Sequence, residues 1–191
     1  KREELEALIL AAGQQHMAES GYPRFSAREV AKRIGYSVGT LMHVFGNVDQ
    51  LVMAINSRTF IFWADWLEER LVQTRGQDRI TVLVRGYFEF ASQHRNLWSA
   101  IYEHRPPEGM DMAERLVTER VGLIDIITRE VAAVLPDQPL EDIARLSRSL
   151  IATVHGHCAF ALGGTFALMH ETDPVRLATA RVWGVLRANG A

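Results

Sequence analysis

Polar and basic side chains gather between positions 24 and 45 of this 191-residue chain. Four basic residues stand there against one acid, Glu29, and this local excess of positive charge suits a phosphate backbone. Small polar groups at a helix N-terminus suit the major groove of DNA, because a recognition helix enters the groove by its first turn. We therefore expect contacts with double-stranded DNA from Ser26, Arg28, Lys32, Ser37, Val38, Gly39, Thr40 and His43.

Two short helices that meet at a sharp turn must position these side chains. The Ser26 hydroxyl can cap the first helix, and Glu29 three residues later completes a capping box. Gly35 then ends this helix, since glycine adopts the left-handed conformation without a Cβ clash, and Ser37 caps the second helix. Apolar residues at spacings of three and four should pack the helices together: Val30, Ala31 and Ile34 against Val38, Leu41 and Phe45. A helical hairpin inside an ordinary all-α core fits the same pattern.

The run from Phe25 to Leu51 resembles the DNA-binding signature of the TetR (tetracycline-repressor-like) transcriptional regulators. The residues that carry the resemblance are Gly35, Ser37, Gly39, Leu41, Phe45, Asp49 and Leu51. More weakly, the resemblance extends to the size and layout of the whole chain. Members of the family usually carry Tyr at the position of Met42, an aromatic residue or His at Val44, and Lys at Val48. Because that Tyr and Lys usually touch phosphates, the resemblance implies two fewer backbone contacts here.

The composition bounds the class of protein. Nearly half of the residues are apolar, which is enough for a substantial core. A net charge of −2 argues against a wholly electrostatic nucleic-acid binder, so any DNA contact should be confined to one patch. The single Cys158 rules out a disulfide framework within the chain and favours the reducing cytoplasm. No apolar run approaches the length of a membrane span, so we expect no membrane partner.

Helical periodicity predicts an all-α protein with two domains. Residues 1–47 should form a three-helix helix-turn-helix DNA-binding domain, and residues 48–191 a helical domain for effector binding and dimerisation. The expected helices run over 1–20, 26–34, 37–45, 48–75, 79–94, 96–104, 111–135, 140–169 and 173–188. Within the long fourth helix, residues 59–67 are apolar around most of the circumference and should be buried on more than one side. No segment shows the alternation of a strand.

The last two helices are expected to form the interface of a homodimer. The first carries an apolar stripe with small residues beside it, and small side chains let helices approach closely. The stripe comprises Leu146, Leu150, Val154, Cys158 and Ala161, and the small residues include Gly156, Gly163 and Gly164. In the second, Ala178, Val182, Val185 and Leu186 face one way. Two such helices can pair with their symmetry copies in a four-helix bundle. Burial within one chain is the alternative.

Aromatic side chains are candidates for the wall of a small-molecule pocket. We expect an effector to meet Phe62, Trp63, Trp66, Phe88, Trp98, Tyr102 and His155. A filled aromatic core would account for the same residues. Resemblance to a one-component regulator favours a pocket for an apolar or amphipathic effector.

The cluster His155, His157 and Cys158 is the one that suggests a metal or a nucleophile. Residues two apart on a helix point to nearly opposite sides, so the two histidines cannot readily share an ion. Phosphate loops, HExxH zinc motifs and nucleophile elbows are absent from the sequence. We expect no catalytic residue, metal or cofactor, and no enzyme activity.

We therefore expect a homodimeric DNA-binding transcriptional regulator that a small effector releases from its operator. We expect repression in preference to activation. The mechanism is a population shift, in which the effector favours a separation of the recognition helices that no longer fits adjacent grooves. The rival hypothesis is a ligand-binding or scaffold dimer that has lost specific DNA binding. Met42 and Val48 motivate that rival.

Overall fold

The computed structural model describes residues 1–110 and 113–191, and the regular elements in this part of the chain are all helices. They are α1 (Arg2–Ser20), the 3-10 turn η1 (Tyr22–Arg24), α2 (Ala27–Arg33), α3 (Val38–Phe45), α4 (Val48–Leu71), α5 (Asp78–Gln93), α6 (Arg95–Glu103), α7 (Glu114–Val134), α8 (Leu140–Leu162), α9 (Thr165–Leu168) and α10 (Pro174–Ala188). The all-α prediction is confirmed. The predicted start of the seventh helix at Asp111 and Met112 lies outside the described residues.

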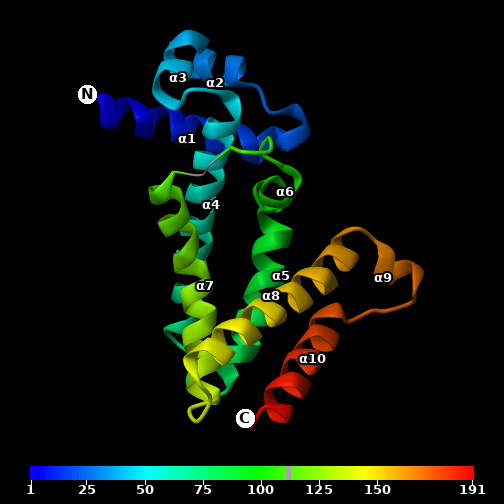
Figure 1. Cartoon of the computed structure of the whole chain (residues 1–191). Helices are drawn as coiled ribbons and strands as arrows, with labels where there is room; N and C mark the ends of the chain where they lie inside the picture. Colours follow the sequence, from blue (N-terminus) through cyan, green and yellow to red (C-terminus); the bar gives the residue numbers. More distant parts are fainter. Residues whose placement is uncertain (111–112) are drawn as a thin grey trace. The chain divides into compact units, whose positions relative to one another are not determined.

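Two compact units make up the chain (Figure 1). The first unit comprises residues 1–62 and 94–121, and the second comprises residues 63–93 and 122–191. Helices α4 and α7 contribute to both units. Among the described residues, no single helix is long and apolar enough to cross a membrane, and only the bent pair of α3 and α4 meets the length and composition of a span.

The core of the first unit joins α1, α2, α3 and the first half of α4. Its centre is fully buried and consists of Ile9, Met17, Val30, Leu41, Leu51 and Ile55. Helices α1 and α4 approach each other closely at Gly13, where an added Cβ would lie 2.6 Å from Ile55 Cδ1. A larger residue there would require the Ile55 side chain to shift.

The core of the second unit lies between α5, α8 and α10, and α8 and α10 run side by side (Figure 1). Their buried residues are Ile143, Ser147, Leu150, Val154 and Cys158 on α8, and Ala178, Val182 and Leu186 on α10. Helix α10 is anchored further where Trp183 Nε1 donates a hydrogen bond to Thr81 Oγ1 at 3.3 Å. Val154 and Val182 thus pack inside their own chain, which corrects the prediction that they form an intermolecular seam.

Two helices end earlier than predicted. Helix α8 ends at Leu162 and not at residue 169, because Gly164 takes a left-handed conformation with φ of 78° and starts the short α9. Helix α4 ends at Leu71 and not at residue 75. Its terminal carbonyl, Leu71 O, accepts a hydrogen bond of 2.7 Å from Arg79 Nη1, so an arginine from the next helix caps it.

The middle of α4 is less enclosed than predicted. The wholly buried stretch is residues 51–57, ahead of the aromatic run. Beyond it Trp63 and Leu67 are buried, but Ile61 is 41% exposed. Burial there follows one side of the helix, as expected of an amphipathic helix at a unit's surface.

Candidate DNA-binding surface and effector cavity

The first turn of α3 is built by its own capping residue. Ser37 Oγ accepts a hydrogen bond from Thr40 N–H at 3.1 Å and lies 3.0 Å from Thr40 Oγ1. Ser37 and Gly39 are exposed, and Thr40 is half-buried. The predicted cap is confirmed, and it presents small polar groups at the helix N-terminus, where a recognition helix meets base edges.

His16 takes part in the capping of α2, a role that sequence reasoning missed. Ser26 Oγ accepts from Glu29 N–H at 3.4 Å, but Ser26 N–H donates to His16 Nε2 at 3.2 Å. The predicted capping box is therefore half right, because the buried imidazole of α1 takes the place of the Glu29 carboxylate. Burial, with a contribution from the nearby Arg33 charge, lowers the pKa of His16 and keeps the ring neutral, as an acceptor at Nε2 must be.

The basic residues around this turn divide into two groups. Arg33 Nη2 binds Glu19 Oε2 at 2.6 Å, and Arg24 Nε donates to the Ser20 carbonyl at 3.0 Å, so these cations already have partners in α1. Arg28 and Lys32 on α2 are exposed, and in the described part of the chain neither has an ion-pair partner. They are the two cations available to phosphates.

On α3 the remaining candidates differ in exposure. Val38 is 36% exposed, which corrects its assignment to the face that packs on α2, and His43 is exposed. Met42 and Val44, two positions that depart from the family pattern, are partly buried against the core of the first unit. Val48, the third departure, is 44% exposed at the start of α4.

A small apolar cavity lies within the second unit. Its volume is about 40 Å³, enough for a water molecule or two but far below the roughly 300 Å³ of a typical ligand site. Its lining comes from five helices: Leu67 on α4; Ile80, Leu83, Val84 and Tyr87 on α5; Ile127 and Val131 on α7; Leu150, Ile151 and Val154 on α8; and Val182 on α10. An effector could enter only if these side chains moved apart.

One polar pair stands at the wall of this cavity. The Tyr87 hydroxyl, from a lining residue, and His155 Nδ1 share a hydrogen bond of 3.0 Å. Burial lowers the pKa of His155, which keeps the imidazole neutral. The pair can therefore offer both a donor and an acceptor without a charge.

The residues predicted to contact an effector lie elsewhere than this lining. In the second unit, Trp63 stacks on Phe90 at 4.6 Å and meets Tyr87 edge-on, while the Arg70 guanidinium covers the Trp66 ring at 3.5 Å. Phe88 is buried on α5, and His155 reaches the cavity through Tyr87. The other three, Phe62, Trp98 and Tyr102, belong to the first unit. Their contact with an effector stays a prediction.

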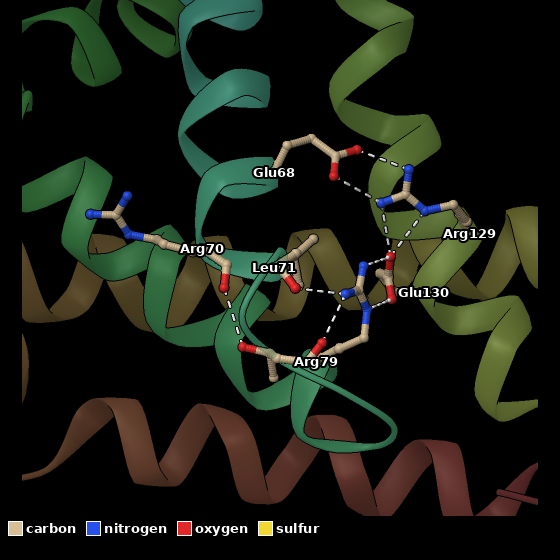
Figure 2. Close-up of polar contacts among 7 residues, drawn as sticks. Glu68, Arg70, Leu71, Arg79, Arg129 and Glu130 are labelled. Atoms are coloured by element: carbon tan, nitrogen blue, oxygen red, sulfur yellow. Dashed lines mark hydrogen bonds and ion pairs between the residues drawn. The ribbon is translucent and has the colours of Figure 1, made fainter.

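An ion-pair network links three segments of the second unit (Figure 2). The buried Glu130 carboxylate receives Arg79 Nε at 2.6 Å and Arg79 Nη2 at 2.8 Å, and Arg129 Nη2 at 2.8 Å. Arg129 also holds Glu68 of α4 at 2.8 Å. Hydrogen bonds from Arg79 above all lower the pKa of Glu130, so the carboxylate stays ionised. Ile80 and Val131, the chain neighbours of Arg79 and Glu130, line the cavity.

The histidine and cysteine cluster on α8 has other bonds. His157 Nδ1 lies 2.8 Å from the Thr153 carbonyl, and burial raises the pKa of the Cys158 thiol to about 12. A thiol with that pKa supplies almost no thiolate at neutral pH. Within the described residues no group of three or more metal-ligating side chains occurs.

Comparisons with known proteins agree with this architecture. Residues 9–55 match the family profile "Bacterial regulatory proteins, tetR family", and residues 80–182, more than half of the chain, match "Tetracyclin repressor-like, C-terminal domain". No curated protein sequence is significantly similar to the chain.

Solved structures share the fold across nearly the whole chain. A Rhodococcus sp. RHA1 protein of unknown function is 23% identical, with a TM-score of 0.74 over 96% of this chain and 94% of that one. The Bacillus subtilis regulator FadR, solved with stearoyl-CoA, is 14% identical (TM-score 0.67; coverage 97% and 99%). RolR, solved with resorcinol, is 17% identical (TM-score 0.67; coverage 100% and 90%). Together with the profile matches, the helix-turn-helix of α2 and α3 makes this chain a DNA-binding transcriptional regulator of the TetR family.

Proposed function

We propose that two copies of this chain form a repressor that a small effector releases from its operator. The observation that carries the proposal is the pairing of two features in one chain. One is the exposed, self-capped first turn of α3 beside the unpartnered cations Arg28 and Lys32. The other is a small apolar cavity in the second unit. The functional boundary near residue 47 belongs to this proposal.

The effector would act by shifting a population of conformations. A ligand larger than the cavity binds only a form whose wall has opened, so it stabilises that form. Helix α4 begins just after α3 and contributes Leu67, one turn before its end, to the cavity wall, which makes it the element to carry the change. In the released form the two recognition helices would no longer match adjacent major grooves, about 34 to 36 Å apart. The ligands held by FadR and RolR support responsiveness to a small molecule.

The dimer interface would use the outer faces of α8 and α10. Gly156 and Gly184 are exposed there, and an added Cβ at either would meet nothing within 4 Å of its own chain. Phe160 is 48% exposed on α8, and Val185 is exposed on α10. Small residues with apolar neighbours let two helices approach a symmetry-related pair closely, in an isologous four-helix bundle.

DNase footprinting on the fragment upstream of the chain's own gene tests the proposal. A dimer should protect two half-sites of a pseudo-palindrome, with centres about 10 base pairs or a multiple of that apart. Protection of one half-site would contradict the dimer. Equal protection of any sequence, or none, would favour the rival hypothesis of a dimer that has lost specific DNA binding.

A further inference from the structure

The wall of the cavity contains no charged side chain: its lining residues are Leu, Ile and Val, together with Tyr87. Moving an ionised carboxylate from water into such surroundings costs several kcal/mol unless a partner cation compensates it. An anionic ligand in this cavity would therefore need a cation from the second unit.

Five arginines lie within two residues of the lining in sequence. Arg85, Arg148 and Arg181 are exposed and do not line the cavity, whereas Arg79 and Arg129 are already bound. Arg79, next to Ile80, donates to both oxygens of Glu130 and to the Leu71 and Thr74 carbonyls. Arg129, two residues from Ile127, binds Glu130 and Glu68 (Figure 2). To pair with Arg79 or Arg129, an anionic ligand would have to take the guanidinium group from Glu130. That exchange would leave the buried Glu130 carboxylate with fewer partners, so it would bring no net gain in free energy.

The pair of Tyr87 and His155 is the polar group that a ligand in this cavity would meet. A phenol hydroxyl donates one hydrogen bond and accepts others, and neutral imidazole has one donor and one acceptor nitrogen. A hydroxyl or carbonyl group on a ligand can join or replace the 3.0 Å bond between Tyr87 and His155. A carboxylate can accept from this pair but still lacks a compensating charge.

We infer that the effector is an uncharged molecule with an apolar body and a hydroxyl or carbonyl group that hydrogen-bonds to the Tyr87 and His155 pair. This inference rests on the proposed function, in that the cavity is taken as the effector site. It narrows the class of effector from apolar or amphipathic molecules to neutral ones. Fatty acid anions and other carboxylates are expected to bind poorly, because no charged side chain is among the described residues that line the cavity.

Two probes of equal chain length test the charge: decan-1-ol and decanoate at neutral pH. Titration calorimetry and thermal melting should show that decan-1-ol binds and raises the melting temperature, because it binds only the folded state. Decanoate should bind at least about 100-fold more weakly, as expected for an unpaired charge in an apolar site. Equal affinity for the two probes, or binding of neither, would overturn the inference.

The variant Tyr87→Phe tests the hydrogen bond, since it removes the hydroxyl and keeps the ring that meets Trp63. It should weaken decan-1-ol binding by about tenfold, the usual effect of losing one buried hydrogen bond. The matched control is Tyr36→Phe, an exposed tyrosine of the first unit, which should leave the affinity unchanged. If Tyr87→Phe bound decan-1-ol with unchanged affinity, the ligand would not hydrogen-bond to Tyr87, and the inference would be contradicted.

The proposed function can fail separately. If decan-1-ol binds as expected but leaves DNA affinity unchanged, the inference about the cavity stands and release by the effector is contradicted. If decanoate binds instead and releases the DNA, the repressor proposal stands and the neutral effector is wrong.

Discussion

Around α3 the polar groups are bonded to near neighbours in the sequence, whereas around the cavity they are bonded to residues 51 and 68 positions away. Ser37 binds Thr40, and Ser26 binds Glu29, each three residues on. By contrast, Arg79 binds Glu130, and Tyr87 binds His155. The first turns of α2 and α3 are set mainly by local bonds, with His16 of α1 as an added partner of Ser26, whereas the cavity needs five helices in place.

Because of this difference, substitutions in the two regions should affect different properties of the protein. Exposed side chains on α2 and α3 should change DNA affinity with little change in the free energy of unfolding. Buried side chains around the cavity should change stability first. Each of the following experiments asks whether the separation holds.

The largest effect is expected at the buried end of the ion-pair network. Glu130→Ala should lower the free energy of unfolding by about 3 to 5 kcal/mol, because it removes the carboxylate that compensates Arg79. Urea unfolding measures this. Glu141→Ala, which breaks an exposed pair with Arg145 at 3.5 Å, is the control and should cost at most about 0.5 kcal/mol. Similar small losses of unfolding free energy in both variants would show that the ion-pair network does not stabilise the fold.

The next effect concerns assembly. Gly156→Arg on α8 has room within its own chain, so the monomer should fold, and a residue other than glycine favours the helix. In the proposed interface its bulk and charge should raise the dimer dissociation constant at least about 100-fold, or roughly 2.7 kcal/mol. Light scattering reports the mass. Gly122→Arg on α7, a glycine with equally open surroundings, should remain dimeric; a dimeric Gly156→Arg would place the interface elsewhere.

A smaller effect is expected on the DNA surface. Arg28→Ala and Thr40→Ala should each weaken specific binding by about 1 to 3 kcal/mol, with the midpoint of urea unfolding nearly unchanged. Arg145→Ala, an exposed arginine on α8, is the control for the lost charge. Operator affinity that matches the wild type in both variants would contradict the docking of α2 and α3.

Stability should also depend on pH through His16. Its pKa is lowered in the folded protein, so the unfolded chain binds more protons as the pH falls below the usual histidine value of 6.5. The stabilisation is thus present above that value and lost as the pH drops through the folded pKa. Urea unfolding over this range should show a shallower pH dependence in His16→Gln than in the wild type. Identical pH profiles in the two proteins would contradict a lowered pKa of His16 in the folded state.

The subtlest effect comes from Val48, where relatives commonly carry lysine. Val48 is exposed, so Val48→Lys should fold normally. One more phosphate contact should steepen the slope of log affinity against log salt by about 0.9 per subunit, or about 1.8 for a dimer. Sequence preference should not change, because phosphate contacts position and do not specify. If Val48→Lys left the salt slope unchanged, the rival hypothesis of a dimer that no longer binds specific DNA would be strengthened.

The features that the sequence predicted well are the local ones. Ser26 and Ser37 both cap helices as expected, because a cap involves residues three apart. The break at Gly164 was missed, since a small residue within an apolar stripe is equally suited to close helix packing. Only the backbone conformation distinguishes the two roles.

The cavity and its surroundings were not predictable in the same way. The aromatic residues predicted to form the pocket do not line the cavity, whose lining is aliphatic except for Tyr87. Leucine, isoleucine and valine are the ordinary residues of any helical core, so nothing marks the few that border a cavity. The partnership of Arg79 with Glu130 depends on how α5 meets α7, which no spacing in the sequence encodes.

Fluorescence anisotropy of a labelled upstream fragment, titrated with the protein between about 50 and 200 mM salt, tests whether α2 and α3 recognise an operator. The wild-type protein should bind this fragment at least about 1,000-fold more tightly than a scrambled one. The affinity should fall with salt, and Arg28→Ala should remove much of the preference. Equal affinity for both fragments at every salt concentration would contradict the assignment of α2 and α3 to operator recognition.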